Sequence, residues 1–151
     1  MIKEINIKDR KAAEQVLSIQ LPAYKIEAQI INYPDLPPLK DTANTLHITG
    51  ETFFGYFIGA RLCGAVSFKE KNDVLDIHRL VVHPDYFRKG IAQKLLNFIE
   101  GRQMIKKCIV TTGTKNTHAV TFYLKNGFRE VEKIYINELL TITAFEKYLS
   151  N

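Results

Sequence analysis

The stretch HPDYFRKGIAQKLL, residues 83–96, stands between a strongly apolar run and a helical pattern of apolar residues. Pro84 has no N–H for a sheet ladder, so the strand before it is predicted to end at about His83. The apolar pattern then resumes with helical spacing, and it places in one stripe Ile91, Leu95, Leu96 and Ile99. The stretch therefore predicts a loop that leads from the end of a strand to the N-terminus of a helix.

This loop has the properties of a phosphate-binding site. The first amides of a helix lack intrahelical partners and lie at the positive end of the helix dipole. Gly90 has no Cβ, so a bulky anion can approach the backbone, and Ala92 is nearly as small. Arg88 and Lys89 add positive charge beside these amides. The alternative is a strand-to-helix turn that needs glycine for its own geometry and carries two solvated cations.

On both sides of the loop, the sequence predicts strands and helices in turn. Predicted strands cover residues 1–7, 52–59, 62–69, 74–82, 107–113, 128–136 and 139–149. Predicted helices cover residues 10–24 (with an end or kink at Pro22), 23–32, 91–104 and 116–127. Short turns between the second, third and fourth strands predict an antiparallel meander. The whole order predicts an α/β fold, with one domain over residues 1–151 and a mixed central sheet of about seven strands flanked by helices.

Caps and helix breakers set the expected helix ends. Asp9 and Asn116 precede two of the predicted helices and are typical N-cap residues. Pro22 is expected to end or kink the first helix, with residues 23–32 continuing as a second helix. Residues 33–45 contain three prolines and are expected to form an irregular loop.

Composition narrows the class of protein. Lys and Arg number 21 against 16 Asp and Glu, which gives a net charge of +5 at pH 7 with the cations scattered along the chain. This mild excess suits an anionic small molecule at least as well as a nucleic acid, so no nucleic-acid partner is expected. Cys63 and Cys108 lie in apolar stretches and are expected to be buried thiols, and no metal site is predicted. No signal sequence or membrane span is recognisable, so no membrane partner and a cytoplasmic location are expected.

Residues 81–96 and 116–128 together resemble the GNAT superfamily of acetyl-CoA-dependent N-acetyltransferases. In that family a strand ending Val-x-Pro precedes a loop of pattern Gln/Arg-x-x-Gly-x-Gly/Ala, and a later helix opens with Asn and ends Tyr-x-x-x-Gly-Phe. The matching positions are Val82, Pro84, Gly90, Ala92, Asn116, Tyr123, Gly127 and Phe128. The resemblance is strong over residues 75–128 and weak before residue 52, and it implies the GNAT fold for nearly the whole chain.

The resemblance implies that acetyl-CoA is the acyl donor. The CoA pyrophosphate would be held by the backbone amides of Arg88, Lys89, Gly90, Ile91, Ala92 and Gln93. A bulge would separate the strand over residues 74–82 from the next strand. The pantetheine arm would lie in that gap and bond to backbone groups of Leu80, Val81 and Val82. The same amides would polarise the thioester carbonyl, while Asn116 and Tyr123 would contact the cofactor from the other side.

Two positions depart from the family pattern. Phe87 stands where the family usually has Gln or Arg. Because the loop acts through backbone amides, binding is expected to survive, with Arg88 supplying a cation. Thr111 stands where some relatives carry a catalytic Glu five residues before the Asn, so the resemblance does not identify the general base.

Direct attack of a primary amine on the thioester needs two proton transfers. Tyr123 is the predicted acid, because a phenol with a pKa of about 10 stays protonated at neutral pH. The alternative is an aromatic residue in an apolar helix stripe beside Phe122. Asp76 and His78 lie two residues apart on a strand and share one face, so they are the candidates for the general base. The alternative is that both are ordinary polar residues on a half-solvated strand. A side-chain base is also unnecessary if solvent water removes the proton of the amine.

The sequence does not identify the acceptor. Residues 20–40 are expected to form one wall of its cleft, where Glu27 and Asp35 would attract a cationic amine and Tyr24 or Tyr33 would pack on it. The predicted function is acetyl transfer to a small-molecule or peptide amine, and the resemblance makes a homodimer through the last strands plausible. The alternatives are a sensor of the same fold that binds acyl-CoA without turnover and an RNA-binding module that uses the basic excess.

Overall fold

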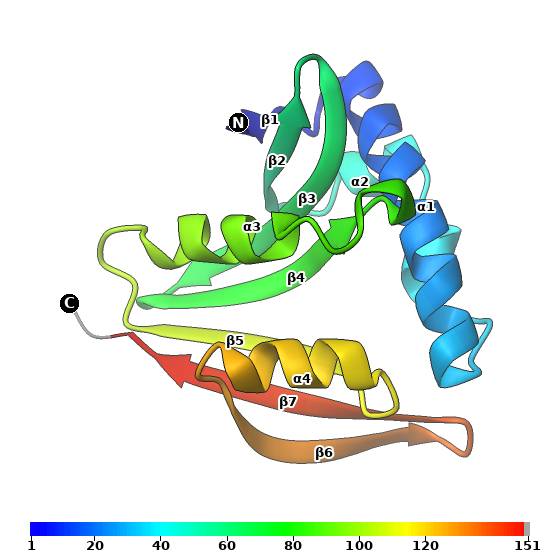
Figure 1. Cartoon of the computed structure of the whole chain (residues 1–151), viewed down its shortest axis with the longest axis vertical. Helices are drawn as coiled ribbons and strands as arrows, with labels where there is room; N and C mark the ends of the chain where they lie inside the picture. Colours follow the sequence, from blue (N-terminus) through cyan, green and yellow to red (C-terminus); the bar gives the residue numbers. More distant parts are fainter. Residues whose placement is uncertain (150–151) are drawn as a thin grey trace.

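Seven strands form one mixed sheet in the computed structural model, which describes residues 1–149 (Figure 1). The strands are β1 (Ile2–Ile5), β2 (Thr52–Ile58), β3 (Arg61–Lys71), β4 (Val74–Val82), β5 (Lys107–Gly113), β6 (Arg129–Asn137) and β7 (Leu140–Tyr148). Their order across the sheet is β1-β2-β3-β4-β5-β7-β6, and within this sheet only β4 and β5 are parallel neighbours. The predicted mixed sheet and the antiparallel meander of β2, β3 and β4 are confirmed.

Helices cover both faces of the sheet. They are α1 (Arg10–Ile31), α2 (Ala43–His47), α3 (Ile91–Glu100) and α4 (Thr117–Lys125), with the short 3-10 helices η1 (Pro37–Lys40) and η2 (Pro84–Tyr86). Successive strand residues point to opposite faces, so Phe53 of β2 packs with α1 and α2 whereas Phe54 packs with α3. All four predicted stripe residues of α3 are buried, but the helix ends before the predicted residue 104.

α1 is one continuous helix through Pro22, so the predicted separate helix over residues 23–32 is wrong. Asp9 caps its start as predicted, and Asp9 Oδ2 accepts a hydrogen bond from the Ala12 amide at 3.1 Å. A proline in a helix interior costs about 3 kcal/mol. Apolar residues on both sides of this proline are buried, namely Val16, Ile19, Ala28 and Ile31. Packing of both halves against the protein therefore outweighs the local penalty.

Residues 33–45 contain η1 and the start of α2, so the prediction of a wholly irregular loop is wrong. Proline is tolerated in the first turn of a helix, and this is where Pro37 and Pro38 lie. Thr42 and Thr45 cap α2 through reciprocal hydrogen bonds between side chain and backbone, at 2.8 and 3.2 Å. Local capping thus produces short helices in a segment whose proline content favours a loop.

Cys63 and Cys108 are free and buried, as predicted. In the part of the chain that the structure describes, no helix is long and apolar enough to cross a membrane. The same residues contain no group of three His, Cys, Asp or Glu side chains arranged to hold a metal ion.

A β-bulge in β4 opens the centre of the sheet. Across β3 and β4, Ser67 pairs with Arg79 but the next residue, Phe68, pairs with Ile77, so His78 is left without a partner. The parallel ladder between β4 and β5 stops at Ile77. Beyond this point the two strands diverge, as Figure 1 shows. The bulge and the separation that the resemblance implied are therefore present.

Candidate functional site

A pocket of about 670 Å³ lies where β4 and β5 separate. Its walls come from β4, β5, one face of α1, the start of α3 and the first turns of α4. The predicted site residues that line it are His78, Leu80, Val81, Val82, Arg88, Gly90, Ile91, Ala92, Gln93, Asn116 and Tyr123. The predicted residues Asp76 and Lys89 do not line it. The tertiary structure thus brings together two segments, residues 78–93 and 116–123, that the resemblance had paired.

The N-terminus of α3 has no side-chain cap, although α1, α2 and α4 each have one. Among residues 1–149, the backbone amides of residues 88–93 have no hydrogen-bond partner. Free amides at a helix start and the helix dipole together favour an anion. Gly90 and Arg88 both have positive φ values, +74° and +64°, and a Cβ on Gly90 would meet no atom within 4 Å. The loop therefore leaves an open, positively polarised surface at the pocket.

Gly64 of β3 lets α3 begin close to the sheet. A Cβ at this position would lie 2.7 Å from Cγ2 of Ile91, the first residue of α3, and 3.2 Å from the Val81 carbonyl oxygen. Only glycine fits this approach without movement of the Ile91 side chain or of the β4 backbone. Gly64 thus helps to place the free amides of α3 beside β4.

One edge of β4 is open toward the pocket. Successive residues of an antiparallel strand direct their backbone polar groups alternately toward and away from the partner strand. The His83 amide donates a hydrogen bond to the carbonyl oxygen of Cys63 in β3, at 2.9 Å. By this alternation, Val81 directs its N–H and C=O toward β3, whereas Leu80 and Val82 direct theirs toward the gap. Of the three residues predicted to bond a pantetheine arm, Leu80 and Val82 have backbone groups free to do so.

Tyr123 lies on α4 with its ring buried and its side chain at the pocket. The ring packs edge-on against Phe122 and Phe128. The alternative stated for Tyr123, an aromatic residue in an apolar stripe of its helix, is therefore correct for its packing. Within the described residues its hydroxyl has no hydrogen-bond partner. Burial, and then the charge of Glu27, raise the pKa of Tyr123 above its usual value. The phenol is therefore protonated at neutral pH and able to donate a proton.

Asn116 joins α4 to α1. Asn116 Oδ1 accepts a hydrogen bond from the Ala119 amide at 3.2 Å and so caps α4 as predicted. Asn116 Nδ2 donates to Glu27 Oε1 at 2.7 Å, and Glu27 also lines the pocket. The sequence had placed Glu27, Asp35 and Tyr24 or Tyr33 in the acceptor wall. Glu27 and Tyr24 do line the pocket, whereas Asp35 and Tyr33 do not. No local signal in the sequence links Glu27 to Asn116, which lies 89 residues later.

Asp76 and His78 are neighbours, as their spacing predicted. His78 Nε2 lies 3.3 Å from Asp76 Oδ2, and His78 Nδ1 lies 3.4 Å from Glu51 Oε2. Each ring nitrogen thus has a carboxylate beside it, which leaves neither nitrogen open for a substrate amine. A role for this pair as general base stays a prediction that the geometry does not favour.

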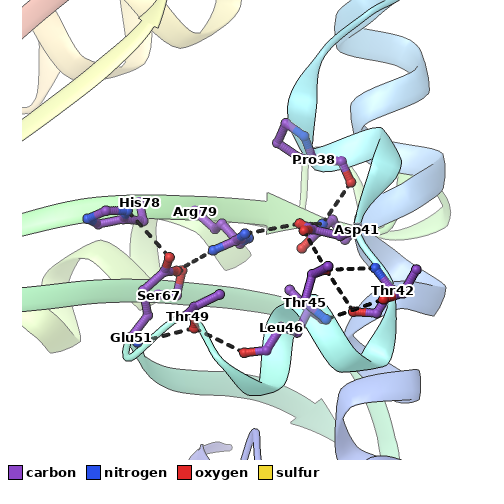
Figure 2. A network of polar contacts seen from close by, with 11 residues as sticks. Pro38, Asp41, Thr42, Thr45, Leu46, Thr49, Glu51, Ser67, His78 and Arg79 are labelled. Carbon is purple, nitrogen blue, oxygen red and sulfur yellow. Dashed lines mark hydrogen bonds and ion pairs between the residues drawn. The ribbon is translucent and has the colours of Figure 1, made fainter.

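A buried polar network lies behind the bulge (Figure 2). The Arg79 guanidinium donates to Asp41 Oδ2 at 3.0 Å and also to Glu51 Oε1. Ser67 Oγ of β3 donates to Glu51 at 2.6 Å, and Gln20 Nε2 of α1 donates to Asp41 at 2.8 Å. The network therefore ties α1 and the segment before β2 to β3 and β4. Sequence reasoning missed it, because its members are far apart along the chain.

Comparison with known proteins assigns the family. Residues 29–149 match the acetyltransferase (GNAT) domain family. The chain belongs to the GNAT family. Because the match covers most of the chain, it confirms the resemblance carried by the α3 loop and by α4.

This GNAT chain is 36% identical over 149 residues to UPF0157 protein YqkA of Bacillus subtilis (strain 168), which covers 98% of the chain and 43% of YqkA. The chain thus spans less than half the length of that relative. Among solved structures, PaiA N-acetyltransferase from Thermoplasma acidophilum in complex with coenzyme A has a TM-score of 0.78 at 21% identity, over 99% of this chain and 98% of that one. The Escherichia coli ribosomal-protein-S18-alanine N-acetyltransferase has a TM-score of 0.77 at 14% identity, over 100% and 94%. These structures share the fold.

Proposed function

We propose that this GNAT domain transfers an acetyl group from acetyl-CoA to a primary amine by direct attack of the amine on the thioester. One observation carries the proposal: a single pocket joins the uncapped start of α3, the open edge of β4 and the Tyr123 side chain. Each part matches one region of the donor: an anionic pyrophosphate, an amide-bearing arm and a thioester.

The residues present fit acetyl-CoA. The pyrophosphate needs several N–H donors and a close approach to the backbone, and residues 88–93 supply free amides around a glycine. The pantetheine arm carries amide groups that can pair as an added strand, and Leu80 and Val82 expose backbone groups toward it. Arg88 lines the pocket and adds charge, which supports the expectation that Phe87 does not prevent binding.

The proposed chemistry places one proton donor at the thioester. An alkyl amine with a pKa near 10.4 must be neutral to attack, and the departing CoA thiolate, with a pKa of about 8.5, must be protonated. Tyr123 is the proposed donor, because its phenol is protonated and lies at the pocket without another hydrogen-bond partner among residues 1–149. A backbone N–H of β4 that faces the gap would stabilise the developing oxyanion.

The first experiment is a calorimetric titration of the protein with acetyl-CoA, with ATP and NAD as controls. Saturable binding of acetyl-CoA alone supports the donor site and justifies a screen of amines read by release of free CoA thiol. Absence of acetyl-CoA binding would contradict the proposal, because the loop of residues 87–92 would then be only a turn.

A sensor that binds acyl-CoA without turnover is the second candidate. Two observations favour it: Thr111, not a carboxylate, lines the pocket on β5, and both ring nitrogens of His78 lie beside carboxylates. Acetyl-CoA binding without transfer to any amine would support the sensor. The expectation of no RNA partner is tested separately by filter binding at low salt, where salt-sensitive RNA retention would contradict it.

A further inference from the structure

Glu27 is the only carboxylate that lines the pocket in the part of the chain that the structure describes. It lies on the face of α1 that also presents Ala23, Tyr24, Ile26 and Ile30 to the pocket. Arg88, which also lines the pocket, puts positive charge beside the start of α3. The pocket is therefore polarised, with one cation at the proposed donor end and one carboxyl group on the α1 wall.

The Glu27 side chain is held in place by a hydrogen bond, but no cationic side chain among residues 1–149 balances its charge. Asn116 Nδ2 donates to Glu27 Oε1 at 2.7 Å, and Asn116 Oδ1 accepts a hydrogen bond from the Ala119 amide. Asn116 thus has a fixed orientation and positions one Glu27 oxygen. Within residues 1–149, no Lys, Arg or His forms an ion pair with Glu27. A largely buried carboxylate without a cationic partner is unfavourable unless it takes up a proton or a ligand supplies a cation.

Burial raises the pKa of Glu27, and the Asn116 hydrogen bond lowers it by less. A raised carboxyl pKa makes the ionised group a stronger base near neutral pH. The titratable groups that line the same pocket are Tyr24 on α1, His78 on β4, Tyr123 and His118 on α4, and Tyr86 and Arg88 at the loop. Beside these groups, Glu27 is the only carboxyl group that lines the pocket among residues 1–149.

We propose that Glu27 binds the ammonium group of the acceptor and then takes its proton, with Asn116 as its positioning residue. This inference rests on the proposed acetyl transfer. It also names the acceptor class: a primary amine on an apolar arm, without a carboxylate next to the amine. Ile26 and Ile30 contact the arm, and a neighbouring carboxylate would be repelled by Glu27.

The proton balance closes without a further reagent. Glu27 takes one proton from the ammonium group, and the neutral amine nitrogen attacks the thioester carbonyl carbon. The C–S bond breaks, and the thiolate takes the Tyr123 proton. The newly acylated nitrogen still carries one proton too many, and it gives this proton to the Tyr123 phenolate. The products are an N-substituted acetamide and free CoA thiol, and Glu27 releases its proton to solvent.

The test compares Glu27→Gln with Glu14→Gln. Both changes replace a carboxylate with an amide on α1, but Glu14 is exposed and does not line the pocket. Gln at position 27 keeps an oxygen that can accept the Asn116 hydrogen bond, and thermal melts check that both variants fold. Both variants should bind acetyl-CoA as the wild type does.

Turnover is read as CoA thiol release with phenethylamine, phenylalaninamide and phenylalanine. Wild type should acetylate the first two and discriminate against phenylalanine at least about 10-fold, because only phenylalanine places a carboxylate beside Glu27. Glu27→Gln should lower kcat/KM for phenethylamine about 100-fold at pH 7. The deficit should narrow to about 10-fold or less at pH 9.5, where more of the amine is already neutral. Asn116→Ser, which keeps an oxygen for the α4 cap, should shift the pH profile and lower kcat less than Glu27→Gln does.

The outcomes separate the two proposals. Equal turnover by Glu27→Gln and wild type, or acetylation of phenylalanine as fast as phenethylamine, would overturn the Glu27 assignment and leave acetyl transfer standing. Acetyl-CoA binding without turnover of any of the three amines would also overturn it and favour the sensor. Absence of acetyl-CoA binding in all variants would overturn the proposed function and this inference together.

Discussion

Arg79 Nη2 donates a hydrogen bond to Asp41 Oδ2 at 3.0 Å across 38 residues of sequence. Arg79 is the residue after the bulge of β4, and Asp41 lies between η1 and α2. The bond therefore fastens the segment between α1 and β2 to the strand that forms one edge of the proposed donor site. In this way the wall proposed for the acceptor and the strand proposed for the donor are held in one arrangement.

We predict that Arg79→Ala destabilises the protein by about 3 kcal/mol, because it leaves two mostly buried carboxylates without their cation. The exposed fractions of the side chains are 12% for Arg79, 14% for Asp41 and 7% for Glu51. Urea denaturation measures the change in the free energy of unfolding. The control is Arg10→Ala, which breaks an exposed i,i+4 pair with Glu14 and should change stability by less than about 0.5 kcal/mol. Equal effects of the two substitutions would show that burial of the Arg79 network contributes nothing.

We predict that Gly90→Val lowers acetyl-CoA affinity at least about 10-fold while the protein remains folded, because the side chain would fill the space in front of the α3 amides. Its matched control is Gly59→Val in the β2–β3 turn. Both glycines have positive φ, +74° and +60°, and at both a Cβ would meet no atom within 4 Å. The two variants should therefore lose similar stability through backbone strain, by about 1–2 kcal/mol. If calorimetry gives the same affinity loss for both, the effect is one of strain and not of the site.

We predict that Tyr123→Phe lowers kcat about 100-fold and leaves acetyl-CoA affinity nearly unchanged, as expected for loss of a general acid. Tyr24→Phe is the comparison, because Tyr24 also lines the pocket and burial also raises its pKa. It should reduce kcat no more than a few fold. A wild-type rate for Tyr123→Phe, or a larger loss for Tyr24→Phe, would move the acid role away from Tyr123.

We predict that both thiols are protected in the native protein. Cys63 and Cys108 are each 0% exposed, so a thiol reagent such as DTNB should react slowly with the folded chain and rapidly with two thiols in urea. The same reagent can then report CoA release without a protein background. Rapid reaction of either native thiol would contradict the burial.

We predict that stability falls as the pH rises from about 9 to 12. Burial, with a smaller contribution from Glu100, raises the pKa of the Cys108 thiol from 9.0 to about 12. In that window the unfolded thiol loses its proton while the folded thiol keeps it, so the unfolded state is favoured by rising pH. The slope of unfolding free energy against pH, measured by urea denaturation, should be shallower in Cys108→Ala. Identical slopes in the variant and the wild type would contradict the assignment.

Local patterns were enough for the elements around the α3 loop. The period of apolar residues located every strand of the sheet, and Asp9 and Asn116 marked two helix starts through their own caps. Errors fell where a local rule competes with packing. Pro22 argues for a break, but buried residues on both sides hold α1 together. In residues 33–45 the prolines favoured a loop, but the segment forms the short helix η1 and the start of α2, whose N-terminus is capped by Thr42 and Thr45.

The site divides in the same manner. The α3 loop and the N-cap and tyrosine of α4 were visible in the sequence, because each depends on residues within one turn or one helix. The bond from Asn116 to Glu27 and the bond from Arg79 to Asp41 were not, because they join residues 89 and 38 positions apart. Hydrogen bonds between distant side chains form only after the sheet and helices have packed. The sequence was therefore sufficient to predict a GNAT fold, a loop suited to an acyl donor and Glu27 as a candidate for the acceptor wall. Only the tertiary structure showed that Asn116 holds Glu27 and that Glu27 has no ion-pair partner among residues 1–149.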